Sequence, residues 1–238
     1  MFETVSESST PFPSGVDLRR LAAATPLGRI EGRNWTKADV LRYRLDGLDI
    51  AVKDYGARPF LVRHTLGRLF TRREQAAYRA ARGLLGLADC YGRVGPFAIA
   101  LRWIDGRTLA ELRDEPFDDA FFDRLAAILA GFHERGVALG DLHHRDVLVG
   151  ADGSIHVVDL ATALTLGDRP GRIRRAAFTR LRDQDLVALA RLRAIWTGRE
   201  EAEAVAAVGS RAAAWHARER RLRRVWDRLR GRYRRGAS

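Results

Sequence analysis

The chain is poor in cysteine and lysine, and it has no long apolar run. Cys90 is the single cysteine among 238 residues, which excludes an internal disulfide and a cysteine-based zinc site. No stretch approaches the roughly 18 uncharged apolar residues that span a bilayer. The N-terminus also lacks the basic-then-apolar order of a signal peptide. We therefore expect a cytoplasmic protein whose fold is held together by packing alone.

The shortage of lysine stands out because the chain is strongly basic. Of its 42 cationic side chains, 40 are arginine, and the only lysines are Lys37 and Lys53. A lysine in such a chain calls for an explanation, because its compact ammonium group binds phosphate as a point charge, whereas arginine presents a planar fork.

The net charge of +12 is concentrated at one end. Residues 211–238 carry eleven arginines against two acidic residues, a net +9, which leaves +3 for the rest of the chain. An apolar stripe that includes Trp215 and Trp226 runs through the same segment, so we expect a basic amphipathic helix over residues 201–238. Three interpretations stay open: the helix packs on the preceding lobe, or residues 211–235 bind an anionic membrane surface, which would place the protein at the inner face of the membrane, or the helix binds nucleic acid. Nucleic acid is the least favoured of the three.

Patterns along the first hundred residues predict a sheet and one helix. The start is rich in Ser, Thr and Pro, and we assign residues 1–26 to a disordered leader. Strands are predicted by alternation and by turn residues, including Asp46-Gly47. The predicted elements are strands 40–45 and 48–53, a helix over 71–87, and strands 91–94 and 97–103.

The remainder is mainly helical and carries a small hairpin, so the fold class is α+β. A helix capped by Asp118 or Asp119 has one apolar face and closes at Gly136. The other predicted elements are a short strand at 137–139, a hairpin of strands 147–149 and 155–158, and helices over 181–196 and 202–235.

Three aspartates lie around this hairpin. Asp141 follows the short strand, Asp146 precedes the first hairpin strand, and Asp159 follows the second. If these carboxylates converge, their repulsion is costly unless cations neutralise it. Taken singly, each aspartate also fits a turn or capping role.

The segment Leu139-Gly140-Asp141-Leu142-His143-His144-Arg145-Asp146, followed by Val157-Val158-Asp159, resembles the catalytic loop and metal-binding segment of the protein-kinase-like superfamily. It is most similar to the small bacterial lipopolysaccharide kinase and RIO-like branch. Ala51-Val52-Lys53 resembles the strand that carries the phosphate-binding lysine, Arg73-Glu74 its ion-pair partner, and Asp183-Gln184-Asp185 the buried aspartate that braces the catalytic loop. The resemblance covers residues 27–196.

The resemblance implies a two-lobed fold with a truncated C-lobe, the N-lobe at 27–103 and the C-lobe at 104–200, with nucleotide between them. It implies that Lys53, paired with Glu74, contacts the phosphates of ATP, and that Asp141 orients or deprotonates an acceptor hydroxyl. Asp146 and Asp159 would hold Mg²⁺. The implied activity is phosphotransfer to a hydroxyl of a lipopolysaccharide core sugar or another envelope glycan, or to a protein Ser/Thr.

Departures from the family pattern keep a second function open. No G-x-G-x-x-G precedes the first hairpin, where residues 34–38 stand instead, and Asp146 takes the place of the usual asparagine. These changes favour a catalytically silent, pseudokinase-like module that binds nucleotide or a partner. Alternatives for single residues are a solvated strand end for Lys53 and an exposed helix ion pair for Glu74.

Histidines near these residues have simpler interpretations. His143 and His144 are adjacent and so point in different directions, which disfavours a shared metal site. We expect His133, on the apolar helix, to be packed and hydrogen-bonded.

Overall fold

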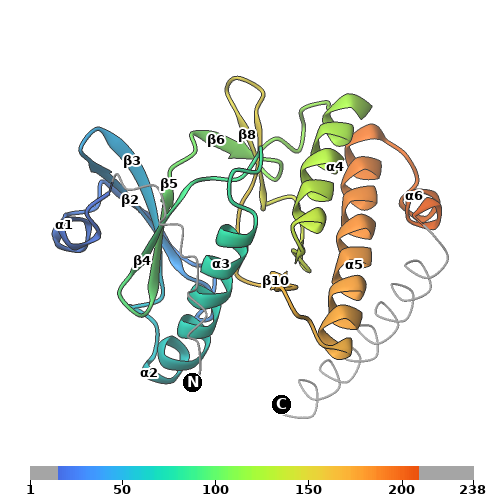
Figure 1. The fold of residues 1–238 in the computed structure, drawn as a ribbon. Coiled ribbons are helices and arrows are strands. Elements are labelled where there is room, and N and C mark those ends of the chain that lie inside the picture. Colours follow the sequence, from blue (N-terminus) through green and yellow to red (C-terminus); the bar gives the residue numbers. More distant parts are fainter. Residues whose placement is uncertain (1–15, 209–238) are drawn as a thin grey trace, which may run out of the picture. The chain divides into compact units, whose positions relative to one another are not determined.

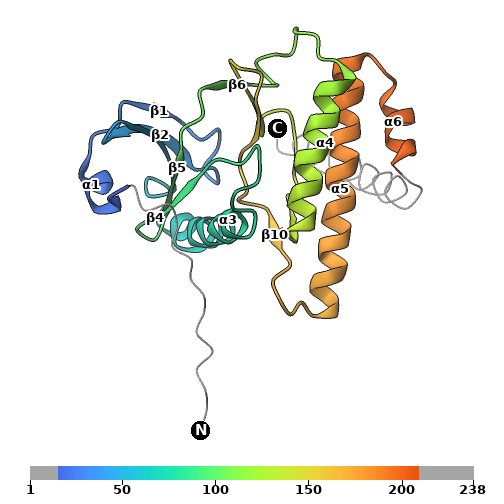
Figure 2. The same ribbon diagram turned by 45° about the horizontal axis from the view of Figure 1, so that its top comes forward.

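The fold is α+β, as predicted. It is seen in a computed structural model that describes residues 16–208 (Figures 1 and 2). The chain divides into two compact units. Of the described residues, the first unit contains 16–105 together with His156–Ala161, and the second contains Gly106–Ile155 and 162–208. The segment 156–161, which we expected in the C-lobe, therefore belongs to the first unit.

The first unit is built on a five-stranded antiparallel sheet of order β1-β2-β3-β5-β4. Both predicted hairpins are present in it. The turn between β2 and β3 places Asp46 and Gly47 at φ 51° and 80°, the two left-handed positions that an Asp-Gly hairpin turn supplies. The strands are β1 (Gly28–Ile30), β2 (Asp39–Leu45), β3 (Leu48–Asp54), β4 (Cys90–Val94) and β5 (Ala98–Arg102).

Helices α1 (Leu18–Ala23) and α3 (Arg68–Ala80) pack on opposite faces of this sheet (Figure 2). Ile50 and Val52 of β3 join Leu21 of α1 in one apolar cluster. Because side chains alternate along a strand, Lys53 points to the other face, where α3 lies. A short helix α2 (Phe60–Val62) and a π-helical turn η1 (Arg63–Gly67) lead into α3.

Two predictions for this unit need correction. The assignment of residues 1–26 to a disordered leader is wrong for its second part, because residues 18–23 form α1. Asp17 caps that helix by accepting hydrogen bonds from the backbone N–H groups of Arg19 and Arg20, and Leu21 is 1% exposed. Residues 1–15 lie outside the described residues. The helix predicted over 71–87 instead begins at Arg68 and ends at Ala80.

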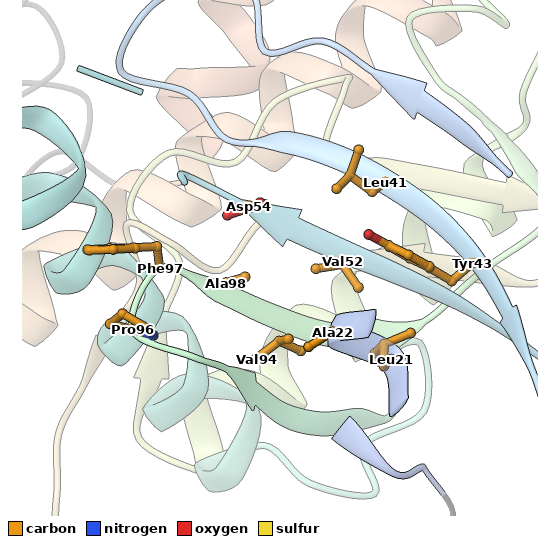
Figure 3. A pocket seen from close by; sticks show the side chains of 10 residues that line it. All are labelled: Leu21, Ala22, Leu41, Tyr43, Val52, Asp54, Val94, Pro96, Phe97 and Ala98. Carbon is orange, nitrogen blue, oxygen red and sulfur yellow. The ribbon is translucent and has the colours of Figure 1, made fainter. Parts of the chain in front are cut away.

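A cavity of about 170 Å³ lies on the α1 face of the sheet (Figure 3). Its lining is mostly apolar, with Leu21 from the helix and Leu41 and Val52 from the strands, and it includes the carboxylate of Asp54. Since Lys53 points to the opposite face, this cavity is not the site suggested by the sequence motifs.

The second unit is dominated by two long helices that lie side by side, α4 (Asp119–Glu134) and α5 (Arg172–Thr197) (Figures 1 and 2). Asp118 caps α4 by accepting a hydrogen bond from the N–H of Phe121, and Gly136 follows it at φ 68°. The capping and apolar face of α4 match the prediction, whereas α5 begins nine residues before the predicted Leu181. The remaining elements are β6 (Gly106–Thr108), β7 (Val137–Ala138), β8 (Val147–Gly150), β9 (Ile155–Val157), β10 (Leu164–Thr165) and α6 (Glu201–Ala207).

The basic C-terminal segment can be compared with the structure only at its beginning. Helix α6 covers Glu201–Ala207, and the residues from 209 onward, with the predicted surface contact at 211–235, lie outside the described residues. Within residues 16–208, no helix has the length and apolarity needed to cross a membrane.

Candidate functional site

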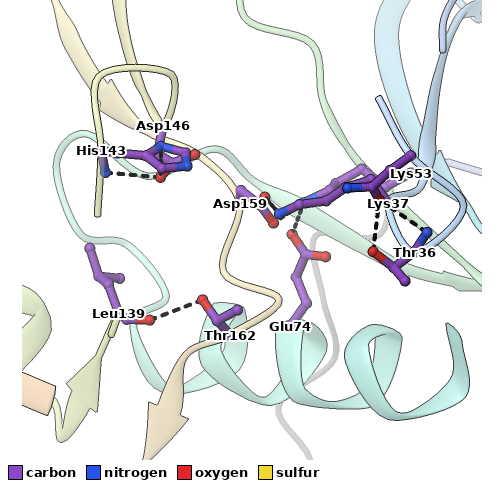
Figure 4. A network of polar contacts seen from close by, with 10 residues as sticks. Thr36, Lys37, Lys53, Glu74, Leu139, His143, Asp146, Asp159 and Thr162 are labelled. Atoms are coloured by element: carbon purple, nitrogen blue, oxygen red, sulfur yellow. Dashed lines mark hydrogen bonds and ion pairs between the residues drawn. The ribbon is translucent and has the colours of Figure 1, made fainter. Parts of the chain in front are cut away.

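A buried ion-pair cluster in the first unit joins the three residues Lys53, Glu74 and Asp159 (Figure 4). The Lys53 ammonium lies 2.7 Å from Oε1 of Glu74 and 2.8 Å from Oδ1 of Asp159. The side chain of Lys53 is 12% exposed and that of Glu74 is 0% exposed, while that of Asp159 is 30% exposed. The two non-functional interpretations, a solvated strand end for Lys53 and an exposed ion pair for Glu74, are therefore wrong.

Glu74 points inward because it shares a helical stripe with apolar residues. Thr71, Glu74, Ala77 and Tyr78 are the buried residues of α3, and their spacing of three and four places them on one side of the helix. A carboxylate on this stripe is unfavourable unless it is paired. Lys53, reaching from the facing side of β3, provides the pairing cation.

Asp159 reaches this cluster through a short segment after β9. The N–H of Val157 donates to the carbonyl of Gly86, 2.8 Å away, and Val157 forms a parallel bridge with Leu87. Asp159 itself has φ 67°, a left-handed conformation that few non-glycine residues adopt. Such a conformation costs free energy and persists only where surrounding contacts maintain it, and residues of this kind are enriched at functional sites.

The cluster shifts the pKa of each member. The charge of Lys53 holds the pKa of Asp159 far below its usual range, against the effect of burial. Burial lowers the pKa of Lys53, but the carboxylates of Asp159 and Glu74 outweigh burial and raise it. Burial raises the pKa of Glu74, an effect that Lys53 only partly offsets. Asp159 is thus a stably ionised carboxylate, neutralised by lysine.

Lys37 makes a contact that the sequence patterns do not predict. Its ammonium lies 3.4 Å from Oδ2 of Asp159, so that both lysines of the chain contact the same carboxylate (Figure 4). The signal that could have found it was composition, since Lys37 is one of two lysines among 42 cationic side chains.

In the second unit, the loop that carries Asp141 is braced by Asp185 of α5. The carboxylate of Asp185, 0% exposed, accepts hydrogen bonds from the backbone N–H groups of Leu139 (2.8 Å) and Gly140 (2.7 Å). It also lies 3.0 Å from Nε2 of His133, which is packed and hydrogen-bonded as predicted. Gly140 has φ 79° and a β-carbon there would lie 3.1 Å from Leu181, so the loop turns tightly at glycine.

Asp141 and Asp146 have different surroundings in this loop. Asp141 directly follows the braced residue Gly140 and is exposed to solvent. Asp146 is 7% exposed, and its Oδ2 accepts a hydrogen bond from the N–H of His143 (3.1 Å) and lies 2.6 Å from the Nδ1 of the same residue. Both aspartates belong to the second unit, while Asp159 belongs to the first.

The His143–Asp146 pair predicts a pH dependence of stability. The carboxylate of Asp146 raises the pKa of His143 above its usual value of about 6.5, with partial burial opposing it and Asp141 adding to it. A raised pKa means that the pair stabilises the fold fully at acidic pH and loses this contribution as pH rises through the raised pKa. We expect the Tm difference between wild type and His143→Gln to be largest near pH 6 and to shrink toward pH 8.5. A difference that stays constant over this range would contradict the pairing.

Carboxylates of the described residues bear on whether the protein could hold a metal ion. Within the described part of the chain, no group of three or more His, Cys, Asp and Glu side chains is arranged to hold a metal ion. Mg²⁺ is usually bound through only one or two carboxylates, with waters and phosphates completing its shell. Asp159 fits such a role, because it is ionised and partly exposed, whereas Asp146 would have to be shared with His143.

Comparison with known proteins does not assign the chain to a family. No protein-family model matches it, and no curated protein sequence is significantly similar to it.

Proposed function

We propose that the protein is an ATP- and Mg²⁺-dependent phosphotransferase of the protein-kinase-like fold, acting on a hydroxyl acceptor. The observation that supports this best is the Lys53–Glu74–Asp159 cluster, in which a strand lysine is held by a buried helix carboxylate and by the aspartate that follows a later hairpin. A buried ion pair contributes little net stability, because the cost of removing both charges from water offsets their attraction. A role in stability alone therefore explains this cluster poorly.

The proposed roles follow from charge and exposure. Glu74 keeps the Lys53 ammonium in place, and Lys53 contacts the phosphates of ATP. Asp159, with 30% of its side chain exposed, is the carboxylate best suited to exchange lysine for Mg²⁺. Bound Mg²⁺ would neutralise the charge on the transferred phosphoryl group. Asp141 accepts the proton of the acceptor hydroxyl.

The short segment between Asp159 and α5 favours a small or envelope-borne hydroxyl as the acceptor over a docked peptide. After Asp159, the chain reaches the start of α5 at Arg172 through residues 160–171, which contain only the two-residue strand β10. A segment of this length leaves little backbone for a platform that aligns a peptide strand. A lipopolysaccharide core sugar or another envelope glycan is therefore the leading acceptor class, and a protein Ser/Thr is the second.

A catalytically silent module is the second candidate function. It is favoured by the contact between His143 and Asp146, since a histidine within 2.6 Å of Asp146 competes with a metal for that carboxylate. Such a pseudokinase-like protein would bind nucleotide or a partner without transferring phosphate.

A thermal-shift titration with ATP, with and without Mg²⁺, separates these functions. For the phosphotransferase we expect Mg²⁺·ATP at about 100 times its Kd to raise Tm by about 5–10 °C, and ATP alone to raise it less. The Asp159→Asn variant should lose the response to Mg²⁺, whereas Asp114→Asn, a matched change at an exposed position, should keep it.

Each other outcome has a distinct meaning. Equal stabilisation by ATP with and without Mg²⁺ would favour the silent module. The absence of any response to ATP in the wild-type protein would contradict nucleotide binding, and with it the phosphotransferase.

A further inference from the structure

The loop between β1 and β2 presents Lys37 to the same carboxylate that holds Lys53. Nζ of Lys53 lies 2.8 Å from Oδ1 of Asp159, and Nζ of Lys37 lies 3.4 Å from its Oδ2 (Figure 4). The two lysines are 16 positions apart in sequence and come from different elements, yet each one contacts its own oxygen of one side chain. An arginine-rich chain thus places both of its lysines at one point.

The loop is constructed so that Lys37 reaches this position. The side chain of Asn34 accepts hydrogen bonds from the backbone N–H (3.1 Å) and the hydroxyl (2.7 Å) of Thr36. The N–H of Lys37 donates to the carbonyl of Asn34, 3.1 Å away. These contacts form a tight turn directly before Lys37.

A buried carboxylate anchors both ends of the loop. Asp39, 3% exposed, accepts hydrogen bonds from the N–H of Gly32 (2.8 Å) and from the guanidinium groups of Arg29 and Arg58. Gly32 packs so closely that an added β-carbon would lie 2.6 Å from the carbonyl oxygen of Lys37. The loop is therefore folded back on itself and held at its base.

The two lysines differ in how easily they can leave Asp159. Lys53 is 12% exposed and is also bound to Glu74, so its position is fixed from two sides. Lys37 is 48% exposed and its ion pair with Asp159 is long, and exposed pairs of this kind contribute little to stability. If Asp159 exchanges its lysine contacts for Mg²⁺, Lys37 is the ammonium group that is free to move to a new anion.

We propose that Lys37 is a second phosphate-binding residue, which contacts the terminal phosphates of a nucleoside triphosphate in place of the backbone N–H groups of a glycine-rich loop. This inference rests on the function proposed above. It accounts for the absence of a glycine-rich sequence before β2, because a lysine ammonium with three donors can supply the contacts that the loop backbone does not.

The test compares the Lys37→Ala variant with a matched control in the same loop, Arg33→Ala, which removes an exposed positive charge. Binding of ATP, inorganic triphosphate and AMP is measured by isothermal titration calorimetry in the presence of Mg²⁺. We expect Lys37→Ala to weaken the binding of ATP and of triphosphate by about 10- to 100-fold, the effect of losing a hydrogen bond to a charged group. AMP binding should change less than twofold, as should all binding by Arg33→Ala.

The outcomes separate this inference from the function on which it rests. If wild type binds no ATP, the proposed function fails and this inference fails with it. If wild type binds ATP and Lys53→Ala abolishes binding while Lys37→Ala binds as wild type, the phosphate role of Lys37 is overturned and the proposed function stands.

A second measurement needs no variant. Because the chain has only two lysines, acetylation by an amine-reactive reagent followed by peptide mass spectrometry reports on each of them separately. Saturating Mg²⁺·ATP should slow the acetylation of Lys37 at least fivefold. An unchanged rate at Lys37 under conditions that protect Lys53 would overturn the inference.

Discussion

On the proposed phosphotransferase function, replacing Asp141 by asparagine is expected to slow the Mg²⁺-dependent release of ADP from ATP by about 10²–10⁴-fold, with little change in the affinity for ATP. The reason is that asparagine keeps the size of the side chain but cannot accept a proton, and general-base catalysis contributes a rate factor of this size. The substitution is also structurally mild, because Asp141 is exposed and the loop is braced at the preceding residue, Gly140. ATP hydrolysis with water as acceptor, or autophosphorylation, provides the assay.

The control for this experiment is Asp114→Asn, the same change at another exposed position of the second unit. It should turn over ATP at the wild-type rate. Wild-type turnover by Asp141→Asn would exclude Asp141 as the base, whereas a lost affinity for ATP would show that it acts on the nucleotide side instead.

Replacing Asp185 by alanine is expected to lower the free energy of unfolding by about 3–5 kcal/mol, since each buried polar group left without its partner costs about 1–3 kcal/mol. The buried carboxylate satisfies the N–H groups of Leu139 and Gly140 and the ring nitrogen of His133, and alanine would leave all three without their acceptor. Urea denaturation followed by circular dichroism measures the loss.

A matched control lies two residues earlier on the same helix. Asp183 is paired with Arg182 at 3.6 Å near the surface, so Asp183→Ala should change the free energy of unfolding by no more than about 0.5–1 kcal/mol. If Asp185→Ala does not accumulate as a folded protein, Asp185→Asn, which keeps the volume and one oxygen, provides the measurement. A loss for Asp185→Ala as small as the one expected for Asp183→Ala would show that the brace contributes little to the free energy of unfolding.

Parts of the fold that depend on neighbouring residues could be predicted from the sequence. The Asp46-Gly47 turn and the capping aspartate Asp118 act over a few residues, and the elements that they delimit were predicted to within one or two residues. Element ends without such signals were less predictable. Helix α5 begins at Arg172 without a capping side chain. Helix α1 was missed although Asp17 caps it, because a helix of six residues gains its stability from packing on the sheet.

The candidate site was predictable as a list of residues but not as a set of contacts. The resemblance to kinases suggested the pair formed by Lys53 and Glu74, whereas local sequence also allowed both residues to be exposed. Nothing in the spacing of the chain indicated that Lys37 would contact Asp159, which lies 122 positions away.

By itself, then, the sequence determined the hairpins of the sheet, the apolar face of α4 and the two lysines that an arginine-rich chain retains, because these depend on periodicity, turn chemistry and composition. Only the tertiary structure decided that Glu74 is fully buried, that segment 156–161 joins the first unit, and that both lysines meet at Asp159. The physical reason is that an apolar stripe shows which side of an element packs inward, but not which distant side chain will neutralise a charge placed on that side.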